Sequence, residues 1–564
     1  MNVPFFSRNG KAGGISLNAC SAPTIIDFII FVRVRTYQLY LLSVMSGLLL
    51  GFSWFPNSFL PLIFIAFVPL LMAEQEVFSN PYKHRSITLF VCSYLTFFLW
   101  NIISTWWVKN ASFGGAAMAI LCNALLMSMV FMTFHSVKKR IGEKWSYLIF
   151  ISFWLGWEYF HLNWHLSWPW LTLGNVFADF PSIIQWYEFT GVFGGSLWIL
   201  TVNLLLFSCI SYNGKFSFRV KGKKSAGLLA LLILPILISF ALKPTVPAGD
   251  MEVVIIQPNI DPYNEKFTGS PDDQLRKMLQ MAAEKITDST EYVVFPETAI
   301  VDEIWENEMN ESSGIQLLNS FLLSFPDVKI IIGASTSRYY KAGETPSATA
   351  RKFTQEAAYY DSYNTALQLD STGKVQIYHK SKLVPGVEKM PFPFIFKHLS
   401  SLAIDLGGTT GSLGMQDERT VFTSEDPSMK AAPVVCYESI YGEYVGDYIN
   451  NGAQFIAIIT NDGWWGDTPG YKQHLKYGAL RAIETRKWIV RSANTGISCF
   501  IDPAGTILQP TSWWVPAALS GKISLVEERT FYTRFGDYIA LAAVYLAVLL
   551  LVYSWLIRFR MLKK

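Results

Sequence analysis

Three ionisable side chains in the polar half of the chain stand directly after short apolar runs that predict buried strands. They are Glu297 in VVFPETA, Lys380 in IYHKSKLVPG and Cys436 in PVVCYES. In α/β sheets, active sites gather at the carboxyl ends of strands. Singly, each has a commoner structural explanation, because such a glutamate often caps a helix, a lysine is usually solvated and a cysteine usually packs in the core. Together they offer a base, a cation and a nucleophile.

These three groups suit nucleophilic catalysis at a carbonyl carbon. A thiol is a poor nucleophile until it loses its proton, and a partly buried glutamate such as Glu297 can accept that proton. The ammonium of Lys380 and the backbone N–H of Tyr437, the residue after the cysteine, can stabilise the oxyanion of a tetrahedral intermediate. We therefore expect Cys436 to be a nucleophile.

Two other residues offer competing explanations. Cys499 is a possible disulfide partner of Cys436, and such a bridge in an oxidising compartment would abolish the nucleophile. We expect no bridge, because GISCFID around Cys499 reads as a separate buried strand. Lys382 lies two residues after Lys380, and strand alternation places both lysines on one face, so geometry does not choose between them.

Short β-branched and apolar runs bounded by Gly, Pro, Asn or Asp predict the strands that position these residues. Periodic segments at 271–287, 439–450 and 472–487 predict helices between them. Continuous apolar strands indicate sheets covered on both faces, so the class is α/β, with layered sheets between helices. The predicted strands are 251–259, 291–297, 328–336, 363–370, 374–380, 432–438, 453–462 and 495–508.

The first 243 residues have a different character. Hydrophobic residues make up 51% of the 564-residue chain and the mean hydropathy is positive, which is unusual for a soluble enzyme of this length. Long apolar runs predict membrane-spanning helices. Seven are centred on 40–55, 59–73, 87–108, 116–134, 147–160, 191–210 and 226–242, and an eighth, at 538–557, closes the chain.

Basic residues alternate along the connections between these runs. Connections on one side carry clusters of Lys and Arg, whereas those on the other carry almost none, as the positive-inside rule requires. The basic connections are 83–85, 138–144 and 215–224, together with both ends of the chain. The pattern predicts an even number of spans, both termini in the cytoplasm and residues 243–537 on the far face of the membrane.

This pattern divides the chain into four parts. Residues 1–36 form a cytoplasmic or interfacial segment, 37–243 a bundle of seven spans, 244–535 an extracytoplasmic α/β domain, and 536–564 the last span with a basic tail. The net charge of +3 is too small to indicate a nucleic-acid partner. Six cysteines without a CxxC pair or a His/Cys cluster give no sign of a metal site.

Two further groups of residues, charged side chains near 472–487 and the tryptophans of 161–190, are explained by structural roles without chemistry. His474, Arg481, Glu484 and Arg491 lie on or near a predicted helix, and we expect them to form a salt-bridge network that holds the domain. The loop 161–190 has no Lys or Arg, and its tryptophans at 164, 168, 170 and 186 are typical of an aromatic belt at a membrane interface. Lipid gating by this loop is the alternative.

The order Glu–Lys–Cys, with each residue after a strand, resembles the nitrilase superfamily of carbon–nitrogen hydrolases. The signatures FPET, YHKSKLVP and VVCYES carry this resemblance. Seven spans before this domain and one after it, with SWPWLTLGN at 167–175 and TNDGWWGD at 460–467, are similar to the apolipoprotein N-acyltransferase family. The resemblance covers residues 37 to 560 and implies a nitrilase-like α-β-β-α sandwich.

By that resemblance, Glu297 is the general base and acid, Lys380 the oxyanion stabiliser and Cys436 the nucleophile. The family also depends on a glutamate eight residues after the lysine, which matches Glu388. This spacing favours Lys380 over Lys382.

The resemblance also implies residues that shape the site. Tyr437 and Glu438 match a Tyr–Glu pair after the cysteine, and Trp464 matches a tryptophan that contacts substrate. Phe267 stands where the family has a tryptophan. The chain departs from the family in two other places, with Phe295 for the tryptophan of WPE and VPGVE for VPFGE.

The reaction that the resemblance implies has two steps in a ping-pong scheme. Cys436 takes an acyl chain from a phospholipid as a thioester, and the N-terminal amine of a diacylglyceryl-cysteine on an apolipoprotein then accepts it as an amide. The resemblance further implies a multi-pass protein of the bacterial inner membrane with a periplasmic catalytic domain. A monomer without a metal or organic cofactor is expected.

Two other classes of function compete with this one. The first is a membrane-anchored amidase or nitrilase acting on a small substrate, although seven spans exceed what an anchor needs. The second is a transporter with an external binding domain, although the predicted spans hold few ionisable residues and no obvious broken repeat pair.

Overall fold

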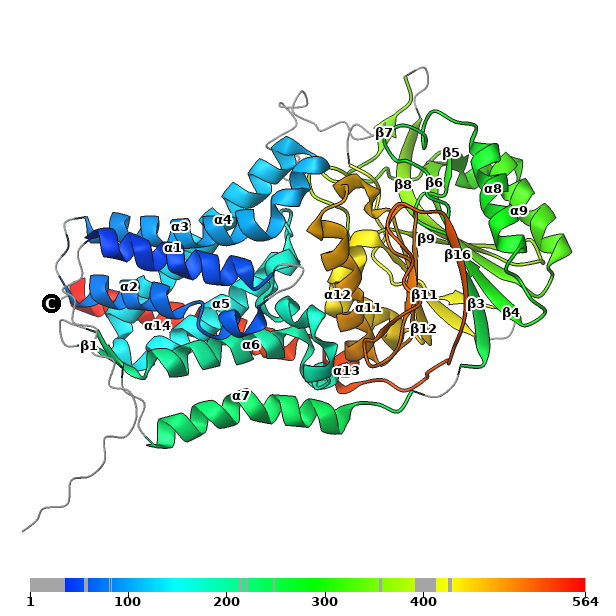
Figure 1. Ribbon diagram of the computed structural model, residues 1–564. Coiled ribbons are helices and arrows are strands. Elements are labelled where there is room, and N and C mark those ends of the chain that lie inside the picture. Colours follow the sequence, from blue (N-terminus) through cyan, green and yellow to red (C-terminus); the bar gives the residue numbers. More distant parts are fainter. Residues whose placement is uncertain are drawn as a thin grey trace, which may run out of the picture.

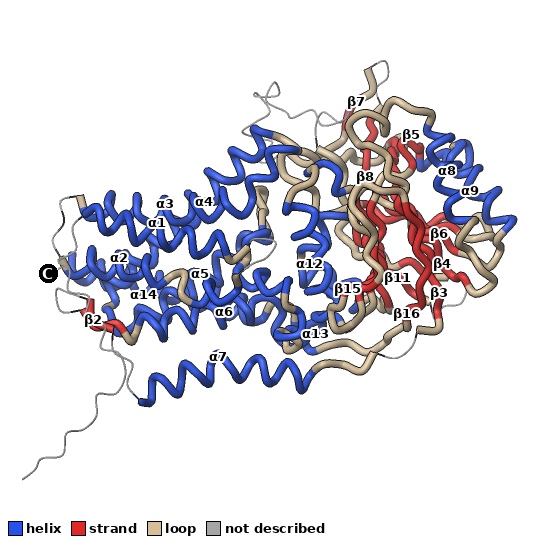
Figure 2. The backbone as a smooth tube through the Cα atoms, viewed as in Figure 1, coloured by secondary structure: helices blue, strands red, loops and turns tan. Residues whose placement is uncertain are grey.

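The computed structural model places a bundle of apolar helices beside an α/β domain (Figure 1, Figure 2). It describes residues 36–562 apart from 55–58, 81, 83, 213–215, 219–221, 247–248, 355–357, 391–411 and 425–428. Except for Thr36, the segment predicted at 1–36 lies outside the described residues.

Each of the eight predicted apolar runs coincides with a helix. These helices are α1 (Thr36–Phe52), α2 (Val68–Ser79), α3 (Arg85–Thr105), α4 (Phe113–Ile141), α5 (Ser146–Leu162), α6 (Tyr187–Phe207), α7 (Gly222–Leu242) and α14 (Tyr538–Leu562). A short turn, η1 (Leu60–Phe64), leads into α2, and a hairpin of β1 (Ile210–Tyr212) and β2 (Phe216–Phe218) joins α6 to α7. The connection from α5 to α6 contains the short turns η4 (Pro169–Leu171), η5 (Leu173–Asp179) and η6 (Pro181–Ile183).

Six of the described segments are long and apolar enough to cross a membrane. They are Leu60–Ser79, Arg85–Asn110, Phe113–Ile141, Tyr187–Phe207, Gly222–Leu242 and Tyr538–Arg560. Helices α1 and α5 each have 17 residues and rise about 25 Å at 1.5 Å per residue, short of the roughly 30 Å hydrocarbon core. The structure therefore supports about six candidate spans, and the count of eight stays a prediction.

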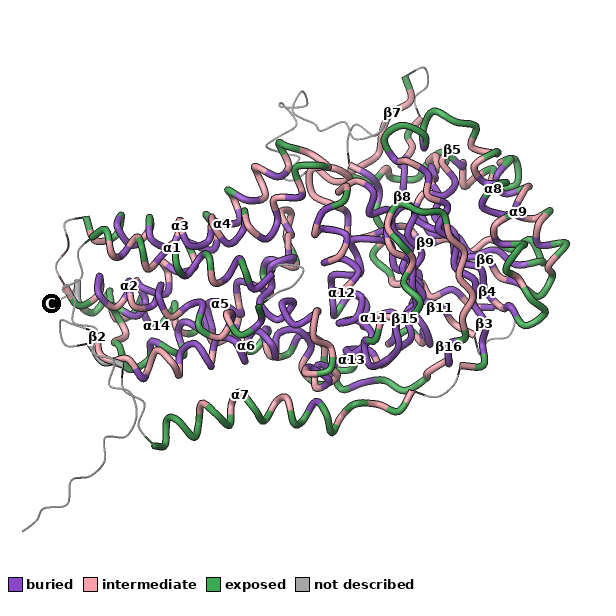
Figure 3. The backbone as a smooth tube through the Cα atoms, viewed as in Figure 1, coloured by how far each residue is buried: buried purple, intermediate pink, exposed green. Residues whose placement is uncertain are grey.

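Packing within the bundle is tight except at α7. A Cβ at Gly47 of α1 would lie 2.7 Å from the carbonyl oxygen of Thr96, so glycine lets α1 approach α3. Helix α7 instead runs along the outside of the bundle with its surface largely exposed (Figure 3), and Ser239 is its one residue classed as buried. Exposed apolar surface on this scale fits contact with lipid.

The first of the two sheets in the α/β domain has the strand order β16-β3-β4-β6-β8-β7. In addition, β5 pairs with β6 and β9 pairs with β8. Strands β3, β4 and β6 are parallel neighbours, whereas β6 and β8 are antiparallel. The strands are β3 (Met251–Gln257), β4 (Thr290–Val294), β5 (Ile300–Trp305), β6 (Lys329–Tyr339), β7 (Arg351–Lys352), β8 (Tyr359–Leu369), β9 (Val375–His379) and β16 (Ala517–Ile523).

A second sheet packs against the first and has the order β10-β11-β12-β13-β14-β15. Its strands are β10 (Phe422–Thr423), β11 (Lys430–Val435), β12 (Phe455–Thr460), β13 (Ile489–Ala493), β14 (Cys499–Ile501) and β15 (Ile507–Leu508). Helices α8 (Pro271–Ala283) and α9 (Ser313–Ser324) cover the first sheet, and α11 (Gly442–Asn450) and α12 (Pro469–Thr485) the second (Figure 1). A short helix, α13 (Phe531–Phe535), leads to α14. The domain is thus layered α-β-β-α.

All eight predicted strand runs and all three predicted helices of this domain coincide with strands and helices. The sequence did not indicate β5, β7, β10, β13, β16, α9 or α13. Strand β13 reads IVRSA and carries the buried Arg491 at its centre, and β16 reads AALSGKI with small residues and a lysine. Neither has the β-branched run or clean alternation that marks a strand.

The domain docks on the bundle through α12 and the connection between α5 and α6. The indole N–H of Trp170 donates to Gln473 of α12 at 2.7 Å, and the Gln473 amide donates to the carbonyl of Trp54 at 3.2 Å. After α12, Arg486 pairs with Glu188 of α6 at 2.8 Å. Helix α12 is therefore held by both halves of the molecule.

Gly174 of η5 tests this docking. A Cβ there would lie 1.9 Å from the carbonyl oxygen of Val192, and backbone atoms cannot yield as a flexible side chain can. We expect Gly174→Ala to destabilise the protein by about 1–3 kcal/mol, the usual cost of overpacking, and to lower the Tm of the detergent-solubilised enzyme. Gly227→Ala on α7, where a Cβ meets nothing within 4 Å, is the control. Equal Tm values for the two variants would contradict the claim that the close contact at Gly174 stabilises the docked arrangement.

Candidate active site

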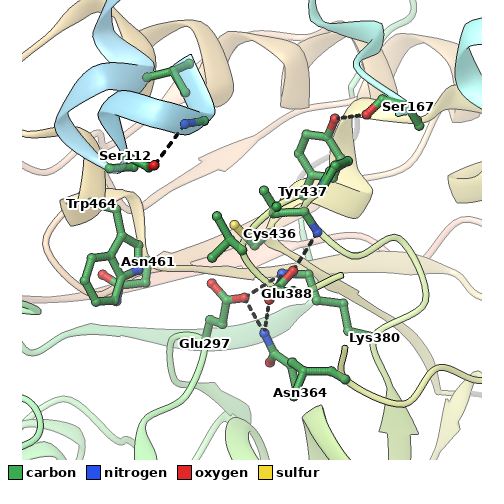
Figure 4. Close-up of a pocket in the computed structure, with 18 of the residues that line it drawn as sticks. Ser112, Ser167, Glu297, Asn364, Lys380, Glu388, Cys436, Tyr437, Asn461 and Trp464 are labelled. Carbon is green, nitrogen blue, oxygen red and sulfur yellow. Dashed lines mark hydrogen bonds and ion pairs between the residues drawn. The ribbon is translucent and has the colours of Figure 1, made fainter. Parts of the chain in front are cut away.

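Cys436 occupies a sharp turn at the end of β11. The strand ends at Val435, and a 3₁₀ turn, η9 (Cys436–Ile440), begins at once. Cys436 has a φ of +50°, a conformation that is uncommon for a residue with a Cβ and that persists where surrounding contacts enforce it. The turn brings the sulfur to the end of the strand, where Figure 4 shows it near Glu297 and Lys380.

Glu438 holds this turn. One carboxylate oxygen accepts from the backbone N–H of Val435 at 2.8 Å. The other accepts from the hydroxyl of Tyr378 at 2.6 Å, the hydroxyl of Tyr444 at 2.7 Å and the N–H of Ser381 at 2.7 Å. Because Tyr378 and Ser381 belong to the first sheet and its following loop, Glu438 ties the cysteine turn to that sheet.

Glu297 follows β4 on a turn pressed against β6. Thr298 has a φ of +47°, and a Cβ at Gly333 would lie 2.5 Å from the Thr298 nitrogen and 2.6 Å from the Glu297 Cα. Glycine at 333 therefore allows the turn to sit on the sheet. From there the Glu297 carboxylate accepts from the side-chain amide of Asn364 at 2.8 Å.

Lys380 follows β9, and its Nζ lies 2.9 Å from Glu297 and 2.9 Å from Glu388. Its side chain is 1% exposed. Asn364 also donates to Glu388 at 2.9 Å, and Glu388 accepts from the N–H of Val384 at 2.8 Å. The structure thus brings Glu297, Lys380 and Glu388 into one buried network beside Cys436 (Figure 4).

The charges of this network determine whether Glu297 or Cys436 holds the proton in the resting site. Burial alone would raise the pKa of Glu297, but the ammonium of Lys380 and the hydrogen bonds from Lys380 and Asn364 outweigh it and hold the pKa below its usual range. Burial and the Glu297 charge raise the pKa of the Cys436 thiol, which Lys380 only partly offsets. The resting site therefore holds a carboxylate and a neutral thiol, as a base and its proton donor require.

A second buried network contacts the backbone of Cys436 through His474 of α12. Asp462 accepts from Arg491 at 2.6 Å and lies 2.9 Å from Nδ1 of His474. Nε2 of His474 lies 3.1 Å from the carbonyl oxygen of Cys436 and 3.0 Å from the hydroxyl of Ser439. The sequence indicated His474 and Arg491 as structural residues but missed Asp462, which joins them.

The predicted network of four residues is in fact two separate networks. Arg481 pairs with Glu484 at 2.8 Å and donates to the carbonyl of Ile440 at 2.9 Å. Glu484 in turn accepts from the N–H of Val192 in α6 at 3.1 Å. This pair therefore links the end of η9 to the bundle, about two helical turns further along α12 than His474.

Comparison with known proteins identifies the family. A family model described as the apolipoprotein N-acyltransferase N-terminal domain matches residues 46–205, and one described as carbon-nitrogen hydrolase matches residues 253–531. An apolipoprotein N-acyltransferase of Chlorobaculum tepidum is 33% identical over 520 residues, covering 88% of this chain and 93% of the relative. The chain belongs to the apolipoprotein N-acyltransferase family.

A second relative and a solved structure are also similar to the chain. An apolipoprotein N-acyltransferase of Geobacter metallireducens is 28% identical over 517 residues, covering 90% of this chain and 93% of the relative. Among solved structures, a Nesterenkonia amidase of the nitrilase superfamily matches with 14% identity and a TM-score of 0.35, covering 53% of this chain and 99% of that one. Because the N-acyltransferases match both halves, the chain is a multi-pass acyltransferase, and the separate amidase and transporter hypotheses are set aside.

The remaining residues predicted for this acyltransferase site lie around one cavity of about 610 Å³ that Glu297, Lys380, Glu388 and Cys436 also line. Tyr437, Trp464 and Phe267 line it too. The hydroxyl of Tyr437 donates to the carbonyl of Ser167 at 3.0 Å, so its side chain reaches the connection between α5 and α6. Phe267 is 51% exposed at the cavity wall.

The two competing residues lie elsewhere. The Nζ of Lys382 sits 4.8 Å from the ring centre of Tyr441, and Lys382 does not line the cavity. Cys436 and Cys499 are both free thiols, and Cys499 lies buried in β14. The structure thus places no bridge between these two cysteines.

Lys266 is a site residue that the sequence did not reveal. It is buried, and its Nζ donates to the hydroxyl of Thr298 at 2.8 Å and to the carbonyl of Glu297 at 3.4 Å. Burial lowers its pKa to about 8, although the nearby Glu297 and Cys436 favour the charged form. The only signal in the sequence was its place beside Phe267, since a lysine in a polar loop usually faces water.

We expect Lys266→Met to weaken the base. The Lys266 charge helps to lower the pKa of Glu297, so its loss raises that pKa and moves the acid limb of the pH–rate profile to higher pH. Loss of the bonds to the Glu297 turn should also slow acyl-enzyme formation by about tenfold or more. The measurement is the rate of acyl-adduct formation against pH, by intact mass. Lys277→Met, at an exposed site on α8, is the control, and an unmoved acid limb would refute the electrostatic part.

Proposed function

We propose that Glu297, Lys380 and Cys436 transfer an acyl chain from a phospholipid to the N-terminal amine of diacylglyceryl-cysteine on apolipoproteins. One observation carries this proposal: the cavity that holds the three residues continues along an apolar face of α4. Gly115, Ala119, Cys122 and Leu126 of α4 all line it. Their spacing places them on one side of the helix, over about 17 Å of its length.

In the first step, Glu297 takes the proton of the Cys436 thiol and the sulfur attacks the ester carbonyl carbon. Lys380 and the backbone N–H of Tyr437 stabilise the oxyanion. The C–O bond then breaks, Glu297 returns the proton to the departing glycerol oxygen, and a lysophospholipid leaves. The acyl chain stays on Cys436 as a thioester.

In the second step, the amine of the acceptor attacks the thioester carbonyl. Glu297 accepts the amine proton, the C–S bond breaks, and the proton passes to the Cys436 sulfur, which restores the thiol. The reaction needs water to be kept from the thioester. The burial of Glu297, Lys380 and Cys436 and the aromatic residues Trp464 and Tyr437 at the cavity wall favour that exclusion.

Glu388, Glu438 and Phe267 complete the proposed site as residues that shape it. Glu388 shares the Lys380 ammonium with Glu297, and Glu438 holds the turn of the nucleophile. The exposed ring of Phe267 stands at the cavity wall, where lipid would pass.

We also propose that all eight apolar helices cross the membrane, with both termini in the cytoplasm and the catalytic domain of a monomer in the periplasm. The carboxyl terminus lies at the end of the bundle that is remote from the α/β domain (Figure 1). Arg85, Lys138, Arg140 and Arg558 lie at the starts or ends of α3, α4 and α14, which supports a cytoplasmic position for that end. In this arrangement the bundle of seven spans covers residues 37–243, the catalytic domain covers 244–535, and the last span with its basic tail covers 536–564.

An acyl-enzyme experiment tests the reaction. The purified protein is incubated with phospholipid and its intact mass is measured. We expect an acyl adduct that is absent in Cys436→Ala, present in the control Cys499→Ala, and discharged by a lipopeptide with a free amine. No adduct with active protein, or discharge by water as fast as by lipopeptide, would overturn the proposal.

Ala119→Trp tests the apolar face of α4. The indole should fill the cavity beyond the active site, so acylation from a long-chain phospholipid should fall while a hexanoyl phospholipid still acylates Cys436. Leu121→Trp, on the outward face of the same helix and 47% exposed, is the matched control. Equal effects on both chain lengths, measured as adduct formation, would contradict an acyl-binding role.

A further inference from the structure

The cavity has a second, polar end that lies on the first sheet. Side chains alternate along a strand, so Asn364, Ser362 and Tyr360 of β8 share one face. In the antiparallel register, Ser335 lies opposite Asn364 and Arg351 of β7 lies opposite Tyr360. All five residues line the cavity. We call Ser335, Arg351, Tyr360 and Ser362 the polar arm.

Arg351 is the unusual member of the polar arm. Among the described residues, two lysine or arginine side chains line the cavity. Lys380 is paired with two carboxylates, whereas the buried Nη2 of Arg351 has no hydrogen-bond partner among the described residues. A partly buried cation without a partner is costly, so an anionic ligand would be stabilised there.

Glu303, a carboxylate in the same part of the cavity, already accepts hydrogen bonds from two serine hydroxyls. Glu303 also lines the cavity, but it accepts from the hydroxyl of Ser337 and, at 3.3 Å, from that of Ser362. No hydrogen bond joins the hydroxyl of Tyr360 or of Ser335 to another residue in the described part of the chain. An entering anion would therefore meet a guanidinium and two free hydroxyl donors, a set that suits a phosphate.

The position of the polar arm fits the donor lipid. Asn364 is hydrogen-bonded to Glu297. Tyr360 lies about 13 Å further along β8 at 3.3 Å per residue. The long side chain of Arg351, which lies opposite Tyr360, can bring its guanidinium closer to Glu297 than that distance. With the ester at Cys436, the acyl chain would follow α4 in one direction. The glycerol and its phosphate would then lie toward β7 in the other.

We propose that Arg351, with Tyr360 and Ser335, binds the phosphodiester of the phospholipid donor. This inference rests on the proposed function and adds the group that orients the donor. The phosphate contact positions the ester over Cys436 and makes the enzyme prefer a phospholipid to a diacylglycerol with the same acyl chains. After the first step, the phosphate leaves with the lysophospholipid through the same arm.

The test compares two donors that differ only in the phosphate headgroup. Wild type, Arg351→Met and Arg351→Lys are incubated with a phospholipid or with the diacylglycerol carrying the same chains, and the rate of acyl-adduct formation is read by intact mass. We expect Arg351→Met to slow acylation from phospholipid by about tenfold to a hundredfold, as loss of a charged hydrogen bond predicts, and to leave the diacylglycerol rate unchanged. Arg351→Lys should retain part of the preference.

Arg338→Met is the matched control, because Arg338 is exposed and pairs with Glu344 outside the cavity. Equal losses with both donors, or no loss with phospholipid, would overturn the inference. Normal acylation with slow transfer to a lipopeptide would overturn it in favour of an acceptor contact. If wild type forms no adduct with either donor, the proposed function itself fails, which is a different result.

Discussion

The buried ammonium of Lys380 lies 2.9 Å from each of two carboxylates, those of Glu297 and Glu388, and the site is arranged around it. Burial and the Glu297 charge raise the pKa of the neighbouring Cys436 thiol more than Lys380 lowers it, so the thiol keeps its proton at rest. The same cation keeps Glu297 ionised despite its burial. Without Lys380, two buried carboxylates would face each other and one would have to take up a proton.

The two sheets meet at this cation. Glu297 and Lys380 come from the first sheet and Cys436 from the second, so the distance between base and nucleophile depends on how the sheets pack. Glu438 secures that packing, because it accepts from Val435 beside the nucleophile and from Tyr378 and Ser381 across the interface. His474 supports the cysteine turn from the helical side.

The bundle completes the site. Trp107 of the connection between α3 and α4 packs edge-on against Trp465 with ring centres 4.9 Å apart, and Gly470 of α12 lies against the same indole. Tyr437 reaches Ser167 on the other side. The cavity therefore has walls from both halves of the chain, which explains how one pocket can offer an apolar path along α4 and polar groups on β6, β7 and β8.

The amino-acid sequence by itself determined the partition into apolar helices and an α/β domain, because hydrophobic length and strand periodicity are local properties. It also determined the residues after strand ends that carry ionisable groups, since Glu297, Lys380 and Cys436 each follow an apolar run. Strand β13 escaped detection because Arg491 breaks its local pattern, although tertiary packing buries the strand. Strand β16 escaped because small residues and a lysine give it no such pattern, and it stays mostly half-buried.

Only the tertiary structure decided which polar residues meet. Lys266 and Arg351 stand in segments with no special pattern, and Asp462 lies in TNDGWWGD with no local sign of its pairing with Arg491. Each becomes notable through burial or through partners from distant parts of the chain. The spacing to Glu388 already favoured Lys380 over Lys382 through the family resemblance, and the fold supplies the physical reason. Strand alternation treats the two lysines alike, but the chain turns after β9, so one ammonium enters the cavity between carboxylates while the other lies over Tyr441.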